Sequence, residues 1–252
     1  MGEPRVAIVT GASGGIGRAI AVAFGGRGWS VALGARRASE LDETAQLVID
    51  AGGNACAHPL DVCSSASIDA FLAAVDGAFG PASILVNNAG IAWIGSAHEM
   101  SDDDHRHIVE TNLLGPILLS KRVIERWRER AEPGDIVFVS SDTTAHPRPY
   151  LATYGASKAG LEAFATTLAL ECEGTAIRPA VVRVGPTLSG FADDWNLEVF
   201  EELMPYWQRF GIQRHFNTMV PEDVARTVVQ VVTAPPHMRV PLVEVQPRAP
   251  TT

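Results

Sequence analysis

The amino-acid sequence predicts a single α/β domain. Its 252 residues, 46 % of them hydrophobic and 19 % charged, are ordinary for a globular protein with a sizeable core. Short apolar runs of the length of buried parallel strands alternate with helical patterns. Two of these runs lead into residues that carry chemistry: RVAIVT (5–10) enters a glycine-rich turn, and IVFV (136–139) precedes two serines.

The charge and the cysteines exclude several classes of protein. A formal net charge of −9 argues against a nucleic-acid or anionic-membrane surface, for which basic stripes are needed. The three cysteines lack metal-ligand spacing, so we expect no metal site and reduced thiols. The chain starts in a strand without a signal peptide, and no apolar run approaches the roughly 18 residues that cross a bilayer. We therefore expect a cytoplasmic protein that acts on a small molecule.

The first strand runs into TGASGGIGRAIAVAF, which has the composition of a glycine turn and a helix start. Gly11 permits a sharp bend, Gly15 lets the backbone approach a pyrophosphate, and Gly17 lets the helix pack closely on the strand. The helix amino terminus attracts the anion. The spacing is GxxxGxG rather than GxGxxG, and a structural turn without a ligand is the alternative. With Ser13 and Ile16, these glycines form the predicted cofactor turn.

The second strand, SVALGA (30–35), indicates which dinucleotide binds. NAD sites tend to carry Asp or Glu about 20 residues past the glycines, to bind the ribose 2′-hydroxyl. This chain has Ala35, Arg36 and Arg37 instead. A guanidinium binds a 2′-phosphate through charge-assisted hydrogen bonds, so NADP(H) is favoured over NAD(H). The alternative is that both arginines form a solvated helix entry.

A helical pattern over 39–51 leads to the third predicted strand, 55–62. We expect Asp61 and Val62 at its end to contact the cofactor. Asp61 either binds the adenine amine or caps the next predicted helix, 64–79.

The fourth strand, within SILVNNAG (83–90), ends in polar and small residues where a parallel sheet meets its ligand crevice. Asn88 is expected to connect neighbouring strands. The backbone around Ala89 and Gly90 is then expected to lie against a ribose.

The strongest chemical pattern follows the run 136–139. A buried helix is predicted from about Tyr150, and Tyr154 and Lys158, four residues apart, share one of its faces. A phenol with an ordinary pKa near ~10 is a poor proton donor unless a nearby positive charge favours its anion. Lys158 supplies that charge, and Ser141 can bind the substrate oxygen. This arrangement fits carbonyl and alcohol interconversion, whereas the alternative is a buried tyrosine beside a lysine that reaches solvent.

TGASGGIG, NNAG, Ser141 and YGASK occur in this order, and the chain resembles the short-chain dehydrogenases/reductases (SDRs) over almost all 252 residues. The resemblance implies a Rossmann-type doubly wound domain with seven parallel strands flanked by helices. It implies a catalytic tetrad of Asn112, Ser141, Tyr154 and Lys158, of which Tyr154 and Lys158 also bind the cofactor. Asn112 would hold a water that connects Lys158 to solvent. A homo-oligomer, tetramer or dimer, is also implied.

Two departures from the family lie near the carboxyl end. After the sixth predicted strand, 176–184, the expected Pro-Gly is replaced by Val-Gly-Pro around Gly185. The loop should face the nicotinamide carboxamide, and either Thr187 or Ser189 takes the place of the family's threonine. The segment 247–252 lacks a glycine pair and is predicted to be a loose tail.

Between these departures, residues 190–219 are rich in bulky side chains and are predicted to form a substrate lid within the single domain 1–252. The alternative is that these side chains pack between subunits. The candidate substrate contacts are Trp93, Ser141, His146, Tyr150, Phe191 and Trp195.

The leading hypothesis is an NADP(H)-dependent oxidoreductase that interconverts a carbonyl and an alcohol on a bulky, hydrophobic substrate. Tyr154 acts as the general acid in reduction. A non-catalytic dinucleotide-sensing or scaffolding protein of the same fold is the alternative, although such relatives usually lose the tyrosine or the lysine. Epimerases and dehydratases of this fold generally carry a larger carboxyl-terminal domain. The sequence names neither the substrate nor the physiological direction.

Overall fold

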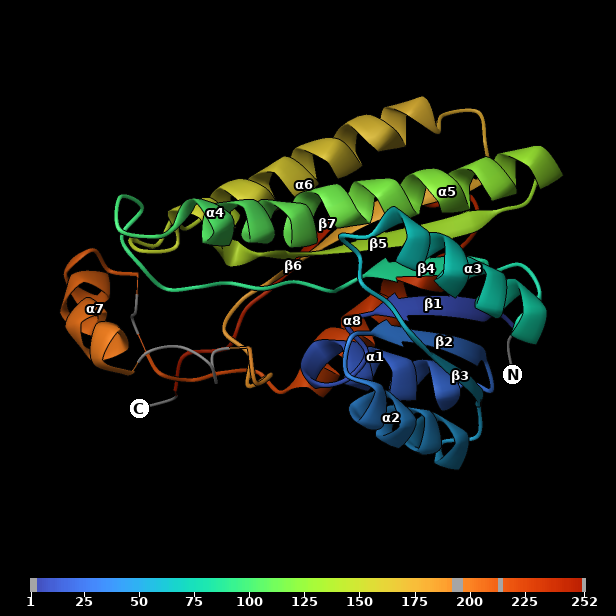
Figure 1. Ribbon diagram of the computed structural model, residues 1–252, viewed down its shortest axis with the longest axis horizontal. Helices are drawn as coiled ribbons and strands as arrows, with labels where there is room; N and C mark the ends of the chain where they lie inside the picture. The colour runs from blue at the N-terminus through green and yellow to red at the C-terminus, as the bar shows by residue number, and fades with distance from the viewer. Residues whose placement is uncertain (1–3, 192–196, 213–214, 251–252) are drawn as a thin grey trace.

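A computed structural model of the chain describes residues 4–191, 197–212 and 215–250. Its centre is a parallel sheet of seven strands in the order β3-β2-β1-β4-β5-β6-β7, with helices on both faces (Figure 1), which confirms the predicted fold class. The strands are β1 Val6–Thr10, β2 Ser30–Ala35, β3 Asn54–Pro59, β4 Ile84–Asn87, β5 Gly134–Ser141, β6 Ile177–Val184 and β7 Leu242–Val245. The helices are α1 Gly15–Gly25, α2 Ala38–Asp50, α3 Ser65–Phe79, α4 Asp102–Val109, α5 Gly115–Arg130, α6 Ala152–Glu171, α7 Leu197–Arg209 and α8 Pro221–Val232.

The two faces of the sheet bury separate apolar cores. Because successive side chains of a strand point to opposite faces, Val9 of β1 packs with Phe24 of α1 and Val228 of α8, whereas Ile8 packs on the other face. The neighbours of Ile8 include Trp127 of α5 and Leu161 of α6. Both faces are covered, which is why the central strands consist largely of apolar residues.

The sheet also determines where a ligand can approach. The chain moves outward from β1 to β2 and β3, then returns to the other side of β1 as β4, so the crossover direction reverses between β1 and β4. In such sheets ligands bind at the carboxyl ends of the strands beside this reversal. Thr10, at the end of β1, accepts hydrogen bonds on Oγ1 from the backbone of Asn88 and Ala89, both at 3.0 Å. Asn88 Nδ2 in turn donates to the Thr10 carbonyl at 2.9 Å, so Asn88 connects the two strands as expected.

Several element boundaries differ from the prediction for local reasons. The helix expected from Tyr150 begins at Ala152, because Tyr150 has a left-handed backbone with φ of 68°. The third strand ends at Pro59, short of Asp61. Ser64 caps α3, while Asp61 Oδ1 accepts a hydrogen bond from the Cys63 backbone at 2.9 Å. The carboxylate of Asp61 therefore stabilises the turn before α3 rather than capping the helix.

The helix after Ser101 is continuous but irregular. Ser101 caps α4, and a π-helical turn, Glu110–Leu114, joins α4 to α5. Such turns shift the side chains that follow them and are frequent at functional sites. This turn carries Asn112. No helix within the described ranges is long and apolar enough to cross a membrane.

The segment between β6 and α8 includes α7, which lies beyond the carboxyl ends of the strands (Figure 1). Helix α7 stands at that end of the molecule, at the left of Figure 1. In the predicted tail, the carbonyl of Arg248 accepts a hydrogen bond from Asn217 Nδ2 at 2.9 Å, so the chain is attached at least to this point. Residues 251–252 lie outside the described part of the chain.

Candidate active site

Ser141, Tyr154 and Lys158 come together where β5 ends against α6. The Tyr154 hydroxyl and the Ser141 side chain are hydrogen-bond partners, and Lys158 Nζ lies 6.0 Å from the centre of the Tyr154 ring. Lys158 Nζ also donates to the carbonyl of Val139 at 2.9 Å. All three functional side chains are buried. The spacing of four residues therefore places the phenol and the ammonium on one face of α6, directed at the end of β5.

Asn112 is fully buried behind this group and binds the segment after β4. Its Oδ1 accepts from the backbone N–H of Ile91, and its Nδ2 donates to the Ile91 carbonyl, both at 2.8 Å. Nδ2 also donates to Ser157 Oγ at 3.1 Å. A Cβ on Gly90 would lie 3.2 Å from Asn112 Oδ1 and 3.3 Å from Lys158 Nζ. Gly90 therefore lets the backbone pass close to two members of the predicted tetrad.

Burial is the largest influence on the pKa values of Tyr154 and Lys158. Burial raises the pKa of Tyr154 to about 12, although the hydrogen bond with Ser141 opposes the rise. Burial also lowers the pKa of Lys158 to about 8, while the carboxylate of Glu162 opposes this change. The net effect on the phenol is thus opposite to the lowering expected from Lys158. At neutral pH the structure holds a neutral phenol beside a mostly protonated lysine.

The glycine turn leaves no room for side chains. A Cβ on Gly11, whose φ is 65°, would lie 2.9 Å from Cα of Ala89. A Cβ on Gly17 would overlap the carbonyl oxygen of Gly11, so the helix packs closely on the residue that follows β1. A Cβ on Gly15 would overlap the carbonyl oxygen of Ser189. The loop after β6 therefore lies directly on the turn.

The start of α1 and the end of β2 fit a dinucleotide phosphate. Gly14 caps α1 without a side-chain hydrogen bond, and the first N–H groups of a helix attract anions. Arg37 Nη2 donates to Ser13 Oγ at 3.1 Å, which places a guanidinium and a hydroxyl together beside the turn. Arg36 is exposed, and Ile16 packs against the core.

Two other predicted cofactor contacts have structural partners. Val62 is buried and lies against Gly115, where an added Cβ would be 2.9 Å from the valine side chain. In the loop after β6, Thr187 Oγ1 donates to the carbonyl of Gly185 at 2.9 Å, and Thr187 pairs with Met219 in an isolated β-bridge. The hydroxyl of Thr187 is therefore bound within its own loop.

The predicted lid contacts the tetrad through apolar side chains. The Phe191 ring lies 5.5 Å from the Tyr154 ring. Leu203 and Trp207 of α7 are buried in a cluster with Leu151 and Tyr154, and Trp207 Nε1 donates to the carbonyl of Pro149 at 3.2 Å.

Of the other predicted substrate residues, Tyr150 packs against the cluster that contains Tyr154. Trp93 packs on His107 with ring centres 5.6 Å apart, and the Tyr150 ring lies 6.4 Å from that of Tyr206. The side chain of His146, another candidate substrate contact, is 59 % exposed and lies 4.0 Å from Glu244 of β7. Trp195 lies outside the described residues.

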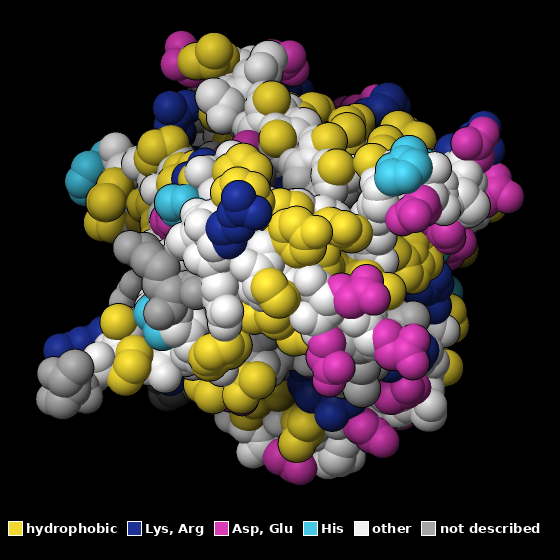
Figure 2. Space-filling model, turned by 90° about the vertical axis from the view of Figure 1, so that its left-hand side faces the viewer, with side chains coloured by type: hydrophobic (Ala, Val, Ile, Leu, Met, Phe, Trp, Pro, Cys, Tyr) yellow, Lys and Arg dark blue, Asp and Glu magenta, His cyan; other side chains and the backbone are white. Residues whose placement is uncertain are grey.

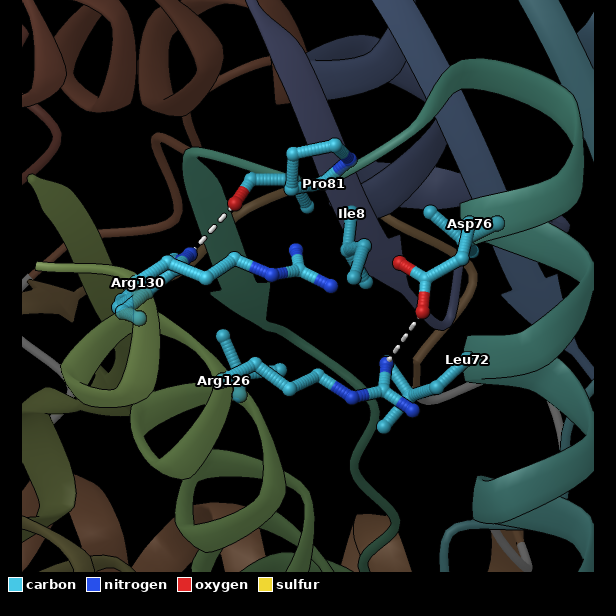
Figure 3. Close-up of a pocket in the computed structure, with 10 residues that line it drawn as sticks. Ile8, Leu72, Asp76, Pro81, Arg126 and Arg130 are labelled. Carbon is cyan, nitrogen blue, oxygen red and sulfur yellow. Dashed lines mark hydrogen bonds and ion pairs between the residues drawn. The ribbon is translucent and has the colours of Figure 1, made fainter. Parts of the chain in front are cut away.

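Hydrophobic side chains gather on the face of the molecule at this end, with acidic side chains beside them (Figure 2). Among the described residues between β6 and α8, the exposed large members are Leu188, Phe191, Tyr206, Phe210, Phe216 and Val220. By contrast, the cavity between α3 and α5 (Figure 3) has about 10 Å³ and includes an ion pair of Arg126 with Asp76 at 3.3 Å. A space of this size holds at most one water, so it is no ligand site.

One group of possible metal ligands was not predicted. Within the described residues, the ligand atoms of Cys63, His107 and Glu110 lie within 4.8 Å of one another. Burial raises the pKa of the Cys63 thiol, and its sulfur lies 3.3 Å from Thr111 Oγ1.

Comparison with known proteins agrees with the geometry. Residues 5–199 match the family model of the short chain dehydrogenases. The chain belongs to this family. This short chain dehydrogenase is 34 % identical over 207 residues to 3beta-hydroxysteroid dehydrogenase 1 of Eggerthella lenta, covering 80 % of the chain and 79 % of that protein.

Two solved structures share the whole fold. An actinorhodin polyketide ketoreductase variant with NADPH has a TM-score of 0.84 at 30 % identity, covering 97 % of this chain and 96 % of that one. A 3-ketoacyl-(acyl-carrier-protein) reductase of Brucella melitensis with NADH has a TM-score of 0.84 at 25 % identity, covering 97 % of both chains. Both are ketone reductases by name, and they differ in the bound cofactor.

Proposed function

We propose that this short chain dehydrogenase is an NADP(H)-dependent oxidoreductase that interconverts a carbonyl and an alcohol. The observation that carries the proposal is the buried group of Ser141, Tyr154 and Lys158, in which the phenol bonds the serine hydroxyl and lies beside the lysine. A neutral phenol is a proton donor, which suits it to the general acid of carbonyl reduction.

Each residue of the proposed tetrad has a distinct task. NADPH, when bound, supplies the hydride. Ser141 Oγ holds the substrate oxygen, and Tyr154 donates its proton to that oxygen as negative charge develops. Lys158 stabilises the phenolate that remains. Asn112 holds the segment at Ile91 and, through Ser157, the helix that carries the pair.

Preference for NADP(H) is part of the proposal. Position 35 is a buried alanine, so no carboxylate at this position repels a 2′-phosphate. Arg37 and Ser13 place a guanidinium and a hydroxyl beside the turn, and Arg36 is exposed next to them. A charged hydrogen bond contributes roughly 1.5–3 kcal/mol, or about one to two orders of magnitude in affinity. The remaining proposed contacts are Gly11, Gly15, Ile16, Gly17, Asp61, Val62, Asn88, Ala89, Gly90, Gly185 and Thr187.

The proposed substrate is bulky and mostly hydrophobic. In the described part of the lid, residues 190–219, the side chains that pack around Tyr154 include Phe191, Leu203 and Trp207, and these offer few polar groups for a small hydroxy acid or a sugar. The names of the hydroxysteroid dehydrogenase and the polyketide ketoreductase relatives point to the same class. Exposure of Tyr206 and Phe210 on the lid is also compatible with the proposed homo-oligomer.

The test is NADPH oxidation against ketones and aldehydes of graded size, repeated with NADH. We expect turnover of bulky ketones with NADPH, and little turnover of small polar ones. The double substitution Ala35→Asp with Arg36→Val should move the preference toward NADH. Equal or tighter binding of NADH by the unmodified protein contradicts the cofactor assignment, and absence of turnover with any carbonyl contradicts the activity.

A further inference from the structure

A buried ion pair spans the loop that joins Ser141 to Tyr154. Arg148 Nη1 lies 2.7 Å from Asp142 Oδ1, and Nη2 lies 2.7 Å from Oδ2. The side chains are only 10 % and 7 % exposed, respectively. The planar guanidinium matches the carboxylate with two parallel hydrogen bonds, which makes the pair geometrically specific.

The ion pair connects the two ends of the loop. Asp142 directly follows Ser141, and Arg148 stands six residues before Tyr154. The Asp142 carbonyl also accepts the N–H of His146 at 2.7 Å. The position of the serine at the end of β5 is thereby linked to the start of α6, which carries the tyrosine.

The backbone next to Arg148 is strained and needs such support. Tyr150, two residues later, has a left-handed backbone, which costs roughly 1–2 kcal/mol for a residue other than glycine. Its carbonyl accepts from the Gly95 N–H at 3.0 Å, and the Pro149 carbonyl accepts from Trp207. The ion pair supports this segment on its other side.

Asp142 has further polar contacts, which begin at Gln246 after β7. Gln246 Nε2 donates to Asp142 Oδ2 at 3.3 Å and to Glu244 Oε1 at 3.0 Å. Glu244 accepts from Arg183 at 2.8 Å, and Arg183 donates to Glu162 at 2.7 Å. Glu162 lies one helical turn after Lys158. One network of charges therefore extends from the helix of Lys158 to the carboxylate beside Ser141.

Resting on the proposed carbonyl chemistry, we propose that Asp142 and Arg148 are positioning residues, which hold Ser141 at the hydroxyl of Tyr154 and determine the charge that faces this hydroxyl. Neither residue donates a proton to the substrate. Their contribution is made through Ser141 and Tyr154.

The groups around Tyr154 give the proposal an electrostatic signature. Burial is the largest influence on the pKa of Tyr154 and raises it, and the Ser141 bond lowers it. The carboxylate of Asp142 then raises this pKa, while the guanidinium of Arg148 lowers it. Lys158 faces the ring from its own helix. The neighbours from the segment after β4 and from α7 are apolar: Ala92, Leu203 and Trp207.

Neutralising Asp142 alone should therefore lower the pKa of Tyr154, and neutralising Arg148 alone should raise it. Alcohol oxidation with NADP⁺ requires Tyr154 to accept a proton, so kcat/KM rises as pH approaches the pKa of the phenol. Asp142→Asn should move this rise to lower pH by about half a unit or more, and Arg148→Met should move it to higher pH. If Asp142 and Arg148 had a purely structural role, both variants would have a lower kcat/KM, but their pH profiles would not move in opposite directions.

Asp135 offers a matched control on the same strand. It is buried at the amino end of β5, ~20 Å from Asp142, and its carboxylate binds Arg5 and Arg178, both at 2.7 Å. Asp135→Asn breaks a comparable ion pair, so it should lower the melting temperature while the pH profile keeps its midpoint.

The double variant, Asp142→Asn with Arg148→Met, covers the case in which a single variant fails to fold. It leaves no unpaired charge, and the opposite effects of the two charges are both removed, so the midpoint of its pH profile should lie between those of the two single variants. Its kcat should fall roughly ten- to hundredfold because Ser141 is no longer held. Wild-type kcat in the double variant, or single variants that shift in the same direction or not at all, overturn the proposal.

Nuclear magnetic resonance separates this proposal from the proposed function. The chain has three tyrosines, so ring-¹³C labelling with Tyr154→Phe as the reference assigns the Tyr154 signal without any substrate. If the unmodified protein reduces no carbonyl, the proposed function fails. The titration of the Tyr154 signal then still tests whether Asp142 and Arg148 determine the charge at this hydroxyl. A titration that moves to lower pH in Asp142→Asn supports the electrostatic role, and an unchanged titration overturns it.

Discussion

The carboxyl end of the sheet, called the sheet edge below because the strands end there, and the proposed lid are stabilised by different kinds of contact. The sheet edge consists of residues 10–17, 88–91 and 139–142. Backbone hydrogen bonds hold its segments in place, and backbone atoms of neighbouring segments occupy the space that a Cβ on its glycines would need. The proposed lid, residues 190–219, contacts the site in its described part through apolar packing and the hydrogen bond of Trp207. Directional contacts tolerate no added atoms, whereas apolar packing accepts many side chains of similar volume. If the proposed function is right, substitutions on the proposed lid should change the substrate range, whereas substitutions at the sheet edge should change the chemistry.

The largest difference in turnover is expected when a tyrosine is replaced by phenylalanine in each of the two regions. Tyr154→Phe removes the proton donor at the sheet edge, so turnover should fall by at least ~10²-fold while NADPH still binds. Tyr206→Phe removes a hydroxyl from an exposed lid side chain and should have only a small effect. Steady-state kinetics and NADPH titration measure both. Near-normal turnover of Tyr154→Phe would assign the proton to another group.

A methyl group added to the sheet edge should also be poorly tolerated. Gly17→Ala places a Cβ against the Gly11 carbonyl oxygen, so we expect a loss of about 1–3 kcal/mol in the free energy of unfolding, with weaker NADPH binding. Gly77→Ala, on α3, meets no atom within 4 Å and should stabilise the helix by up to about 1 kcal/mol. Urea denaturation compares the two. Equal stability of both variants would show that the turn has room to relax.

Stability should depend on pH through Lys158. Its pKa is about 8 in the folded protein and near ~10.4 in an unfolded chain, so between these values the unfolded chain binds more protons. The free energy of unfolding should therefore rise with pH over this window, by about 2 kcal/mol between pH 8 and 10.

Lys158→Met removes this contribution and serves as the reference at each pH. Above about pH 10 the raised pKa of Tyr154 acts in the opposite direction, because the folded protein then holds the proton that the unfolded chain releases. Parallel stability curves for the two proteins from pH 7 to 10 would mean that Lys158 is not desolvated.

The smallest effect is expected on the lid. Trp207→Phe keeps most of the apolar volume and removes the hydrogen bond to Pro149, which contributes about 1 kcal/mol. KM for bulky ketones should rise about fivefold while NADPH affinity and molecular mass stay constant. A variant that dissociates on a sizing column supports packing between subunits instead of a lid.

Local patterns predicted most of the fold and the composition of the site. Apolar runs of strand length predicted the strands, because a strand buried on both faces must be apolar throughout. The glycines of the first turn and the spacing of Tyr154 and Lys158 were equally visible, since a turn and one helical face depend on neighbouring residues only. The family match over residues 5–199 agrees with this.

Contacts between distant residues were decided by the tertiary structure alone. Asp142 and Gln246 are 104 positions apart, and Glu162 and Arg183 come from a helix and a strand, so no local pattern pairs them. The left-handed backbone of Tyr150, which delays the start of α6, depends on the same packing.

Proton affinity shows the division most clearly. The sequence by itself determined that a phenol and an ammonium share a helix face, and from this a lowered pKa of Tyr154 was expected. The folded chain buries both groups, and loss of water raises the pKa of the phenol and lowers that of the lysine. Desolvation depends on every element packed around a group, on α6, on β5 and on the lid, and so it is decided only when the chain has folded.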